Sequence, residues 1–330
     1  MNKLKTGVTA LAGSLMTLSV SAGEMAVTGT AEVTYTTNGA ANTGNPYGMN
    51  TSLGFTGSGD VNGYETTLFM TMSDQMAGMS SASLAVDLGD MGTITFDQGV
   101  GVGGISTIDD KTPSANEEVW DGLDSGTGDS NGLVGGGNSG VFVYSNTLAG
   151  SNFSLQFGKG GSAANSDDAT TAGTSGTSWD FALTNSSLVE GLDVGFGYGK
   201  IANASQDSAA SGDDSNEHMT GYATYTMSGV SVGYQESIIS DNTDGGVPEQ
   251  ATGWGISATV MEGLSVSYGE REIEFQNAGS AHVQEDQEGV AIAYTMGSAK
   301  ISLQNNETSN NSGTANNNDE MTEIALSLSF

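Results

Sequence analysis

Short segments in which apolar and polar residues alternate recur along the whole of this 330-residue sequence. From Met25 to Tyr35 the odd positions carry Met, Val, Gly, Ala, Val and Tyr, whereas Thr and Glu occupy the even positions 28 to 34. Because successive side chains of a β-strand point to opposite faces, this alternation predicts a strand with one apolar face and one polar face. Each segment has about the 9 to 11 residues that a tilted membrane-crossing strand requires.

The same alternation closes the sequence. Ile324, Leu326, Leu328 and Phe330 share one parity, and Glu323, Ala325, Ser327 and Ser329 share the other. Between the two ends, alternating aromatic or aliphatic residues occupy positions 153–157, 179–183, 192–198, 230–234, 254–256, 264–268, 290–294 and 301–303. The intervening positions are mostly Gly, Ser, Thr, Ala or Gln, so each segment could meet lipid with one face and water with the other.

The connections between these segments fall into two classes by length. Seven are short and lie near residues 57–63, 89–92, 148–152, 187–191, 228–229, 261–263 and 297–298. Eight are longer and polar and lie near residues 38–48, 73–83, 99–139, 159–176, 202–216, 237–250, 276–285 and 305–318. Seven turns and eight loops imply about sixteen strands. In a membrane barrel the short turns lie on the periplasmic face, so both ends of the barrel belong there and the long loops lie outside the cell.

The N-terminal residues predict export. Lys3 and Lys5 precede an apolar run from Val8 to Val20, and the residues Val20-Ser21-Ala22 fit the small-residue rule of signal peptidase. We therefore expect residues 1–22 to be a cleaved signal peptide and residues 23–330 to form the barrel. The apolar run is shorter than the roughly 20 residues of a membrane-spanning helix. An exported chain without such a helix either stays soluble or enters a membrane as a closed barrel, because only helices and closed barrels satisfy every backbone group in lipid.

Composition and charge help to decide between a soluble exported protein and a closed membrane barrel. The chain has 50 Gly and 3 Pro residues and shows no sustained helical stripe, which favours strands joined by turns. It has no Cys, so rigidity has to come from a source other than disulfides, such as the unbroken ladder of a closed barrel. Its formal net charge of −32 excludes nucleic acid as a partner.

Four features together resemble the Gram-negative general diffusion porins, over nearly the whole chain after residue 22. They are the opening strand 27–35, the strand Gly92-Thr93-Ile94-Thr95-Phe96 running into a glycine-opened third loop, the rhythm of seven turns, and the final Ala325-Leu326-Ser327-Leu328-Ser329-Phe330. The resemblance implies an all-β, sixteen-stranded antiparallel barrel, usually a homotrimer, whose third extracellular loop folds into the lumen and narrows it. It also implies contact with outer-membrane lipid and lipopolysaccharide, and recognition of the C-terminal strand by the outer-membrane assembly machinery.

The expected constriction loop, residues 99–139, is rich in acidic residues. Its charged residues are Asp109, Asp110, Lys111, Glu117, Glu118, Asp121, Asp124 and Asp129. If the loop lines the lumen, these carboxylates favour cations, because acidic rings lower the entry barrier for positive ions. The alternative is a solvated acidic surface loop. Trp120 could pack this loop against the barrel wall or cap it.

Three charged residues of the strands fall on the parity that faces water. They are Glu32, Asp97 and Arg271, which we expect on the lumen wall because a charge facing lipid would cost roughly 2 to 4 kcal/mol. Porins of the resembling family often carry a cluster of arginines opposite the acidic loop. This chain has only Arg271 and a few scattered lysines, so a strong transverse field is not expected.

Nothing in the sequence predicts an enzyme or a bound cofactor. Gly99-Val100-Gly101-Val102-Gly103-Gly104 fits a dinucleotide-binding pattern, but no helix or parallel-strand pattern surrounds it. His218 and His282 are the only histidines, no nucleophile motif accompanies them, and we expect both to be exposed to solvent. The acidic clusters 167–168, 213–217 and 316–320 could associate loosely with Ca²⁺ or Mg²⁺, but none matches a dedicated calcium loop.

The sequence therefore predicts a porin of the Gram-negative outer membrane that lets small hydrophilic solutes and ions diffuse passively, with a preference for cations. Three alternatives remain open. The barrel could be a structural or adhesive surface protein with a plugged lumen, the chain could be a secreted acidic calcium-binding β protein, or the barrel could be an outer-membrane hydrolase.

Overall fold

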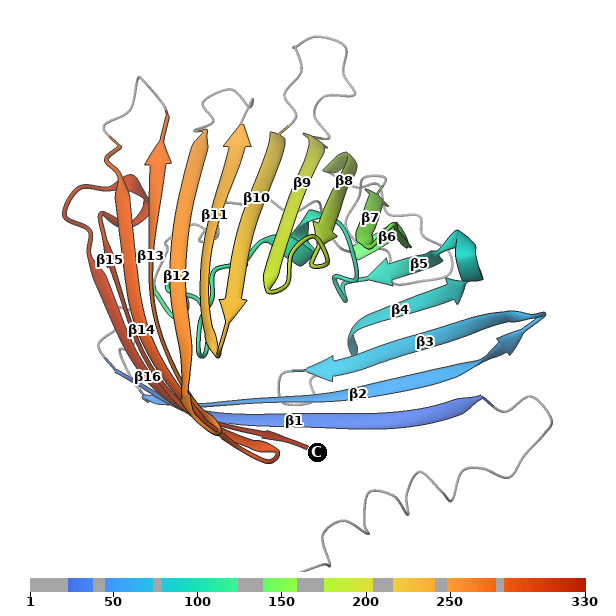
Figure 1. Ribbon diagram of the computed structural model, residues 1–330, viewed down its shortest axis with the longest axis horizontal. Helices are drawn as coiled ribbons and strands as arrows, with labels where there is room; N and C mark the ends of the chain where they lie inside the picture. Colours follow the sequence, from blue (N-terminus) through green and yellow to red (C-terminus); the bar gives the residue numbers. More distant parts are fainter. Residues whose placement is uncertain are drawn as a thin grey trace, which may run out of the picture.

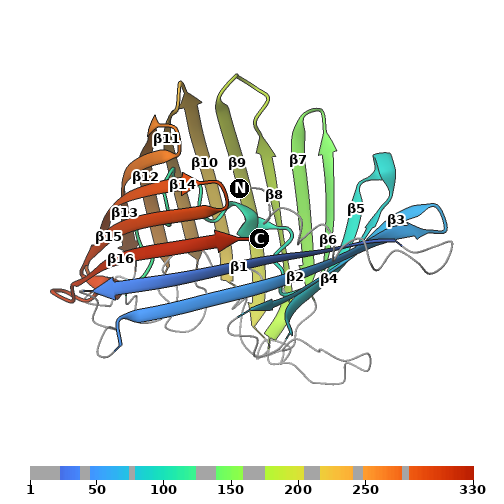
Figure 2. The ribbon, with the colours of Figure 1, turned by 90° about the horizontal axis from the view of Figure 1, so that it is seen from below.

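The computed structural model describes residues 23–37, 45–73, 79–123, 139–158, 175–203, 216–240, 248–276 and 282–330. These residues form one closed antiparallel barrel, in which each strand pairs with its neighbours in the sequence (Figures 1 and 2). Its strands are β1 (Glu24–Thr37), β2 (Tyr47–Val61), β3 (Tyr64–Ser73), β4 (Met79–Asp87), β5 (Thr93–Gln98), β6 (Ser139–Leu148), β7 (Ser151–Gly158), β8 (Ser175–Asn185), β9 (Leu192–Asn203), β10 (Asn216–Met227), β11 (Val230–Ser240), β12 (Glu249–Met261), β13 (Leu264–Phe275), β14 (Glu285–Met296), β15 (Ala299–Ser309) and β16 (Asp319–Ser329). Short 3₁₀ helices η1 (Gly89–Met91), η2 (Ile105–Ile108) and η4 (Asn311–Gly313) lie in the connections. None of the helices in the described ranges has the length and hydropathy of a membrane-spanning helix.

The predicted class of fold and the sixteen strands are confirmed for the described residues, while several predicted strand ends are wrong. The first turn is only Asn62–Gly63, because β2 continues to Val61 and stays paired with β3 through its glycines. Both turn residues have positive φ, which suits a tight two-residue hairpin. β4 begins at Met79, four residues before the predicted end of that loop. Alternation marks the faces of a strand, whereas backbone pairing sets its length.

Several predictions fall outside the described residues. They concern the signal peptide 1–22, the loop residues Asp124 and Asp129, the acidic pair 167–168 and most of the cluster 213–217.

The barrel closes between its first and last strands. β1 pairs with β16 from Thr30 opposite Ser329 to Thr37 opposite Thr322. At the end of this seam the backbone N–H of Gly29 donates to the carbonyl of Phe330 at 2.7 Å, and the N–H of Phe330 donates to the carbonyl of Gly29 at 2.9 Å. Every described strand is therefore paired on both sides, which is the arrangement that lipid demands of a sheet.

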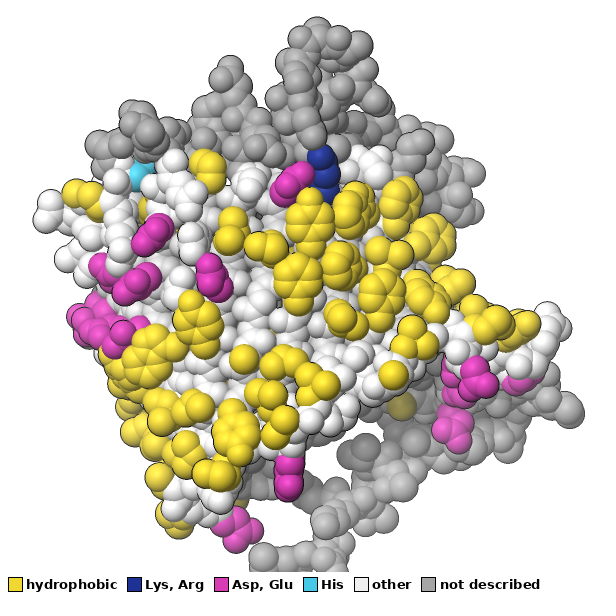
Figure 3. Space-filling view, turned by 45° about the horizontal axis from the view of Figure 1, so that its top comes forward, with side chains coloured by type: hydrophobic (Ala, Val, Ile, Leu, Met, Phe, Trp, Pro, Cys, Tyr) yellow, Lys and Arg dark blue, Asp and Glu magenta, His cyan; other side chains and the backbone are white. Residues whose placement is uncertain are grey.

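The outer face of the barrel is apolar. Large side chains that alternate along the strands point outward and are exposed, among them Val27, Val33, Phe142, Phe157, Trp179, Leu183, Phe196, Val232, Trp254, Ile256, Val290, Ile292, Ile301, Leu303, Ile324 and Leu326. Figure 3 shows such side chains gathered into broad patches over the outside. Contiguous apolar patches of this kind mark an interaction with a membrane or a partner. The inward parity is mostly Ser, Thr, Gln, Asn, Gly and charged residues.

A row of glutamates crosses the outer face near the loop end of four strands. Glu270 of β13 lies opposite Glu288 of β14, Glu288 opposite Glu307 of β15, and Glu307 opposite Glu320 of β16. We call these four residues the glutamate row. Tyr268 donates to Glu270 and, at 3.0 Å, to Glu288. Like charges directly opposite each other on neighbouring strands are destabilising, so the glutamate row lowers the stability of the sheet at this place.

Candidate functional site

The candidate site is the lumen and the segment Gly99–Leu123, which runs along its inner wall and which we call the inner loop (Figures 1 and 2). Asp97, at the end of β5, fixes the start of this loop. Its carboxylate accepts the backbone N–H groups of Val100, Gly101 and Val102 at 2.8, 2.8 and 2.9 Å. Asp97 is 0% exposed, because its inward-facing side chain is covered by the loop that it holds.

The next contact fixes η2 against strands β7 and β8. The hydroxyl of Ser154 accepts the N–H of Gly104 at 2.8 Å, and the carboxylate of Asp180 accepts the N–H of Ile105 at 2.7 Å. Ile105 and Ile108 are buried in a small cluster with Ala182 and Tyr222 of the wall. These are the only apolar residues of the described lumen that form a buried cluster of this kind, and they position the middle of the inner loop.

Polar side chains of β10 and β11 hold the next residues of the loop. Gln235 accepts the N–H of Lys111 at 2.7 Å and donates to the carbonyls of Ile108 and Asp109 at 2.8 and 3.0 Å. Thr224 donates to the carbonyl of Lys111 at 3.0 Å. Because Gln235 uses both its amide nitrogen and its oxygen, it orients the backbone on either side of Asp109.

Strands β13 and β15 hold the last described part. Ser267 accepts the N–H of Ala115 at 2.9 Å. Gln304 accepts from the backbone of Glu117 at 3.2 Å and donates to the carbonyl of Glu118 at 3.0 Å. Asn306 donates to the carbonyls of Glu118 and Asp121 at 3.0 and 2.9 Å. The inner loop is thus bound to the wall from β5 to β15 rather than projecting into solvent.

Trp120 packs the loop onto the single arginine of the chain. The guanidinium carbon of Arg271 lies 4.4 Å from the centre of the Trp120 ring. Arg271 is 3% exposed and donates to Gln287 at 3.3 Å, and its inward-facing side chain lies beneath the loop. Of the two roles open to Trp120 in the sequence, the structure has the ring against the wall.

Inward-facing glycines make room for the loop. A Cβ at Gly233 would lie 2.5 Å from Pro113, one at Gly255 would lie 2.7 Å from the Pro113 carbonyl oxygen, and one at Gly269 would lie 3.0 Å from Val119. Real Cβ atoms tolerate no contact below about 3 Å without movement, so the close approach of the loop needs a wall without side chains here. Part of the high glycine content therefore serves the lumen rather than the turns.

The carboxylates of the loop meet two carboxylates of the wall. Glu117 and Asp121 interact electrostatically with Glu32 of β1 and Glu323 of β16, and Lys300 of β15 is the cation near Glu117. Ser327 donates to Glu32 at 2.5 Å and Thr36 donates to Glu323 at 3.1 Å. We call Glu32, Glu117, Glu118, Asp121 and Glu323 the lumen carboxylates.

Burial raises the pKa values of the loop carboxyls. It raises the pKa of Asp109 to about 6, with a further contribution from the charge of Asp110. It raises the pKa of Glu118 to about 8, helped by a hydrogen bond to the side chain of Asp110. The pKa values of Glu117 and Asp121 are also raised, first by burial and then by repulsion from Asp121 and Glu32, respectively. A carboxyl with a raised pKa keeps its proton to a higher pH than usual.

The structure therefore separates the predicted site residues into two groups. Asp110, Glu117, Glu118 and Asp121 gather with Glu32, and Asp109 and Lys111 adjoin them. Asp97 and Arg271 lie elsewhere under the loop. Glu323 was not among the predicted site residues, although the parity of β16 places it inward. Gln235, Gln304 and Asn306 were not among them either, although the same parity rule points them into the lumen.

The prediction of an exposed His218 is wrong. His218 faces inward from β10, is 1% exposed, and neither ring nitrogen has a hydrogen-bond partner among the described residues. It lies opposite Gly199 of β9, and Asp180 of β8 lies opposite Gly199 on the other side. Because glycine has no side chain, His218 and Asp180 come close to each other there. His282 is exposed and stacks on Phe275 with ring centres 5.5 Å apart. Within the described ranges, no three His, Cys, Asp or Glu side chains are grouped so as to hold a metal ion.

Solved structures with the same arrangement are found among outer-membrane proteins. An anion-selective porin from Comamonas acidovorans superposes with a TM-score of 0.64 at 14% identity, over 93% of this chain and 99% of that one. The chain has a porin fold. The porin OmpF of Salmonella typhi, in a complex with daunomycin, gives a TM-score of 0.64 at 15% identity, over 94% and 98% of the two chains. OmpT, an outer membrane protein of Vibrio cholerae, gives 0.66 at 11% identity, over 95% and 99%.

The porin fold is shared without a recognisable sequence relationship. No model of a protein family matches the chain, and no curated protein matches it either. Identities of 11 to 15% show the fold alone. What a porin fold does in this chain depends on the residues that line its lumen.

Proposed function

We propose that the protein is a channel of the Gram-negative outer membrane that lets small hydrophilic solutes and ions diffuse passively, with a preference for cations. The observation that carries this proposal is a closed barrel whose outer face is apolar and whose polar lumen holds a loop bound along the wall. An apolar exterior is stable in lipid, and a polar interior of this size is stable when filled with water.

The cation preference rests on the lumen carboxylates. Glu32, Glu117, Asp121 and Glu323 lie close together, and Lys300 is the positive charge near them. The arginine that could oppose them is buried under Trp120. A ring of carboxylates concentrates cations and repels anions at a constriction. The Comamonas porin is described as anion-selective, so the fold by itself does not imply a cation preference, and the proposal rests on the charges of this lumen.

Reconstitution into planar bilayers tests the channel and its selectivity separately. The parent protein should conduct, and its reversal potential in a KCl gradient should show cation preference. The variant D109N/D110N/E117Q/E118Q should conduct with a much weaker preference. A matched control is E270Q/E288Q/E307Q/E320Q, which neutralises the same number of carboxyl side chains on the outer face and should keep the parent's preference. No conductance from correctly folded protein overturns the channel, and an unchanged reversal potential in the loop variant overturns the assignment of selectivity.

A structural or adhesive barrel with a plugged lumen is the second candidate function, which the bound inner loop favours. The loop makes contacts from β5 to β15, so it occupies part of the cross-section. A plugged barrel would fold and insert but would not conduct, which the same bilayer measurement distinguishes. For a calcium-binding protein or a metal-dependent hydrolase, the described residues offer no group of His, Cys, Asp or Glu side chains that could hold the ion.

Assembly and targeting belong to the same proposal. We propose a homotrimer that contacts lipid and lipopolysaccharide through its outer face, and insertion by the outer-membrane assembly machinery through β16. One of the structures that match the fold, that of Vibrio cholerae OmpT, is described as a trimer form. Chemical cross-linking of the purified protein in detergent should give a ladder that ends at three copies. Mass spectrometry of the exported protein should place its N-terminus at Gly23.

A further inference from the structure

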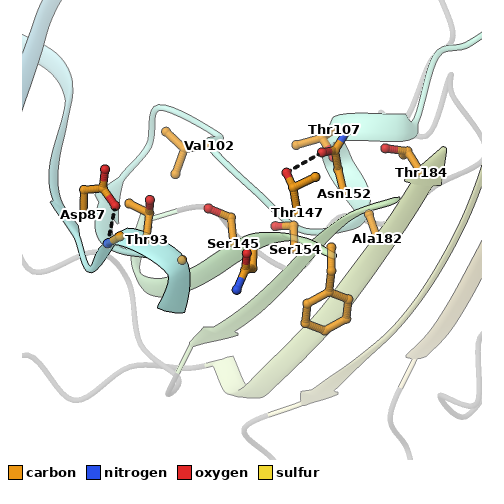
Figure 4. A pocket seen from close by; sticks show the side chains of 14 residues that line it. Asp87, Thr93, Val102, Thr107, Ser145, Thr147, Asn152, Ser154, Ala182 and Thr184 are labelled. Atoms are coloured by element: carbon orange, nitrogen blue, oxygen red, sulfur yellow. Dashed lines mark hydrogen bonds between the residues drawn. The ribbon is translucent and has the colours of Figure 1, made fainter. Parts of the chain in front are cut away.

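A second polar cavity lies apart from the lumen carboxylates, between the inner loop and the wall formed by β4 to β8. Its volume is about 490 Å³, which is within the usual range for small-molecule sites. Thr93, Ser145, Thr147, Ser154 and Thr184 line its wall, Asn152 and Asp87 lie at its sides, and Val102 and Thr107 of the loop cover it (Figure 4). We call this the hydroxyl cavity.

The strand register arranges these side chains as a grid. Thr93 lies opposite Ser145, and Ser145 lies opposite Ser154, which gives one row across β5, β6 and β7. Thr147, Asn152 and Thr184 form a second row, two residues along the strands, across β6, β7 and β8. Neighbouring strands are about 4.8 Å apart and residues two apart on a strand are separated by about 6.7 Å. The wall therefore presents hydroxyls and an amide at intervals comparable to the width of a sugar ring.

Several of these hydroxyls have no protein partner to satisfy them. Thr147 donates to Asn152 at 2.8 Å, and Ser154 accepts from the backbone of Gly104 at 2.8 Å. In the part of the chain that the structure describes, the hydroxyls of Thr93, Ser145 and Thr184 make no hydrogen bond. A hydroxyl can donate and accept, so a surface of free hydroxyls matches a ligand whose own groups also do both.

The charges around the cavity exclude most other ligands. Asp87 is the only ionisable residue that lines it, and one oxygen of its carboxylate already accepts the N–H of Gly89 at 2.8 Å. Among the described residues, no Lys or Arg lines it to hold an anion, and no cluster of carboxylates lines it to hold a metal ion. Val102 and Ala182 add two small apolar surfaces suited to the C–H face of a sugar ring.

We propose that the hydroxyl cavity binds a neutral polyhydroxylated solute, the size of a monosaccharide or disaccharide, during its passage through the lumen. The inference rests on the proposed channel for access, but not on its cation preference. The lumen then has two sides with different chemistry. Cations are favoured beside β1, β15 and β16, and neutral sugars are retained for a short time beside β5 to β8.

Sugar-induced reduction of the ion current tests this inference, with glucose and sucrose as the probes. The variant T93V/S145A/T184V removes the three free hydroxyls and keeps the shape of the wall. A matched control is T28V/S52A/T56V, which changes three hydroxyl residues of the inward parity on β1 and β2. We expect the parent and the control to show the same saturable current reduction. The triple variant should need about tenfold more sugar, because a few hydrogen bonds are lost.

Saturation-transfer NMR on the detergent-solubilised protein measures the same binding without a membrane. Saturation transfer from the parent to glucose or sucrose that is lost in T93V/S145A/T184V supports the inference. A parent that conducts ions but shows neither current reduction nor saturation transfer overturns the inference and leaves the channel intact. Equal binding by the parent and the triple variant overturns it as well. If the parent binds sugar but does not conduct, sugar binding at the hydroxyl cavity is supported and the proposed channel function is overturned.

Discussion

The guanidinium of Arg271 lies 4.4 Å from the centre of the Trp120 ring, and this contact joins the only arginine of the protein to the end of the inner loop. Arg271 is buried on β13 between the wall and the ring. A desolvated pair of this kind is worth about 2 kcal/mol. The same ring that binds the loop to the wall also keeps a positive charge away from the water of the lumen.

Replacing Trp120 should therefore change both the loop and the selectivity. In W120A the loop end loses its contact, and the positive charge of Arg271 loses the ring that covers it on the lumen side. We expect larger current fluctuations in single channels and a reversal potential shifted toward less cation preference. The control is W254A, which removes an outward-facing Trp of β12. Equal noise and selectivity in W120A and the parent would show that the contact does not position the loop.

Cation preference should depend on pH between 5 and 9. The pKa of Asp109 is raised to about 6 and that of Glu118 to about 8. A carboxyl is neutral below its pKa and negative above it, so both groups are charged at pH 9 and both are protonated at pH 5. The cation preference from reversal potentials should fall as the pH is lowered through this range. The variant D109N/E118Q should flatten the profile, and a parent profile that is already flat would contradict the assignment.

A side chain at Gly255 should displace the inner loop. A Cβ there would lie 2.7 Å from the carbonyl oxygen and 3.2 Å from the nitrogen of Pro113, both backbone atoms that cannot rotate away. Valine suits a strand, so G255V should fold but push the loop from the wall. We expect an altered single-channel conductance and weaker cation preference. The control is G221V, where a Cβ would meet only the Gly195 carbonyl oxygen at 3.7 Å, and its conductance should match the parent's.

Divalent cations should stabilise the barrel through the glutamate row. Glu270, Glu288 and Glu307 lie directly opposite one another on the outer face, where repulsion costs stability and counter-ions relieve it. Millimolar Mg²⁺ should raise the temperature at which the barrel loses its folded mobility on a gel, and a chelator should lower it. The variant E288Q/E307Q should be more stable than the parent without Mg²⁺ and less sensitive to it. The control E190Q/E262Q, in two exposed turns, should retain the parent's sensitivity. Equal sensitivity in all three proteins would rule out the row as the source.

The fold could be predicted because, in a membrane barrel, residues that face lipid alternate along each strand with residues that face the lumen. The alternation at Val27 and Val33 and at Ile324 and Leu326 predicts outward residues, and all four are outward and exposed. Strand ends were harder to predict, because β2 continues through glycines that interrupt the pattern but not the backbone pairing. The number of strands was still predicted correctly, because a single break in the alternation is enough to recognise each turn.

The site was harder to predict, because parity shows which way a residue points but not what covers it. Asp97, His218 and Arg271 all point inward, yet each is nearly or completely buried. Asp97 is covered by the loop residues that directly follow it, whereas Arg271 is covered by Trp120, which is far from it in the sequence. The loop itself is held by further contacts between distant residues, such as Lys111 with Gln235. A single sequence carries no signal for such contacts, except that glycines on the inward parity of β11 to β14 leave space for a backbone.

The seam between β1 and β16 joins residues that are 295 positions apart at Ser327 and Glu32. The ladder therefore cannot become a cylinder until both ends of it are present, and until then two unpaired edges are open to strands of other molecules. A polypeptide cut short before β16 would be left as a curled sheet prone to aggregation. Closure of the barrel therefore requires a full-length chain, because only a molecule that contains both β1 and β16 has no unpaired strand edge.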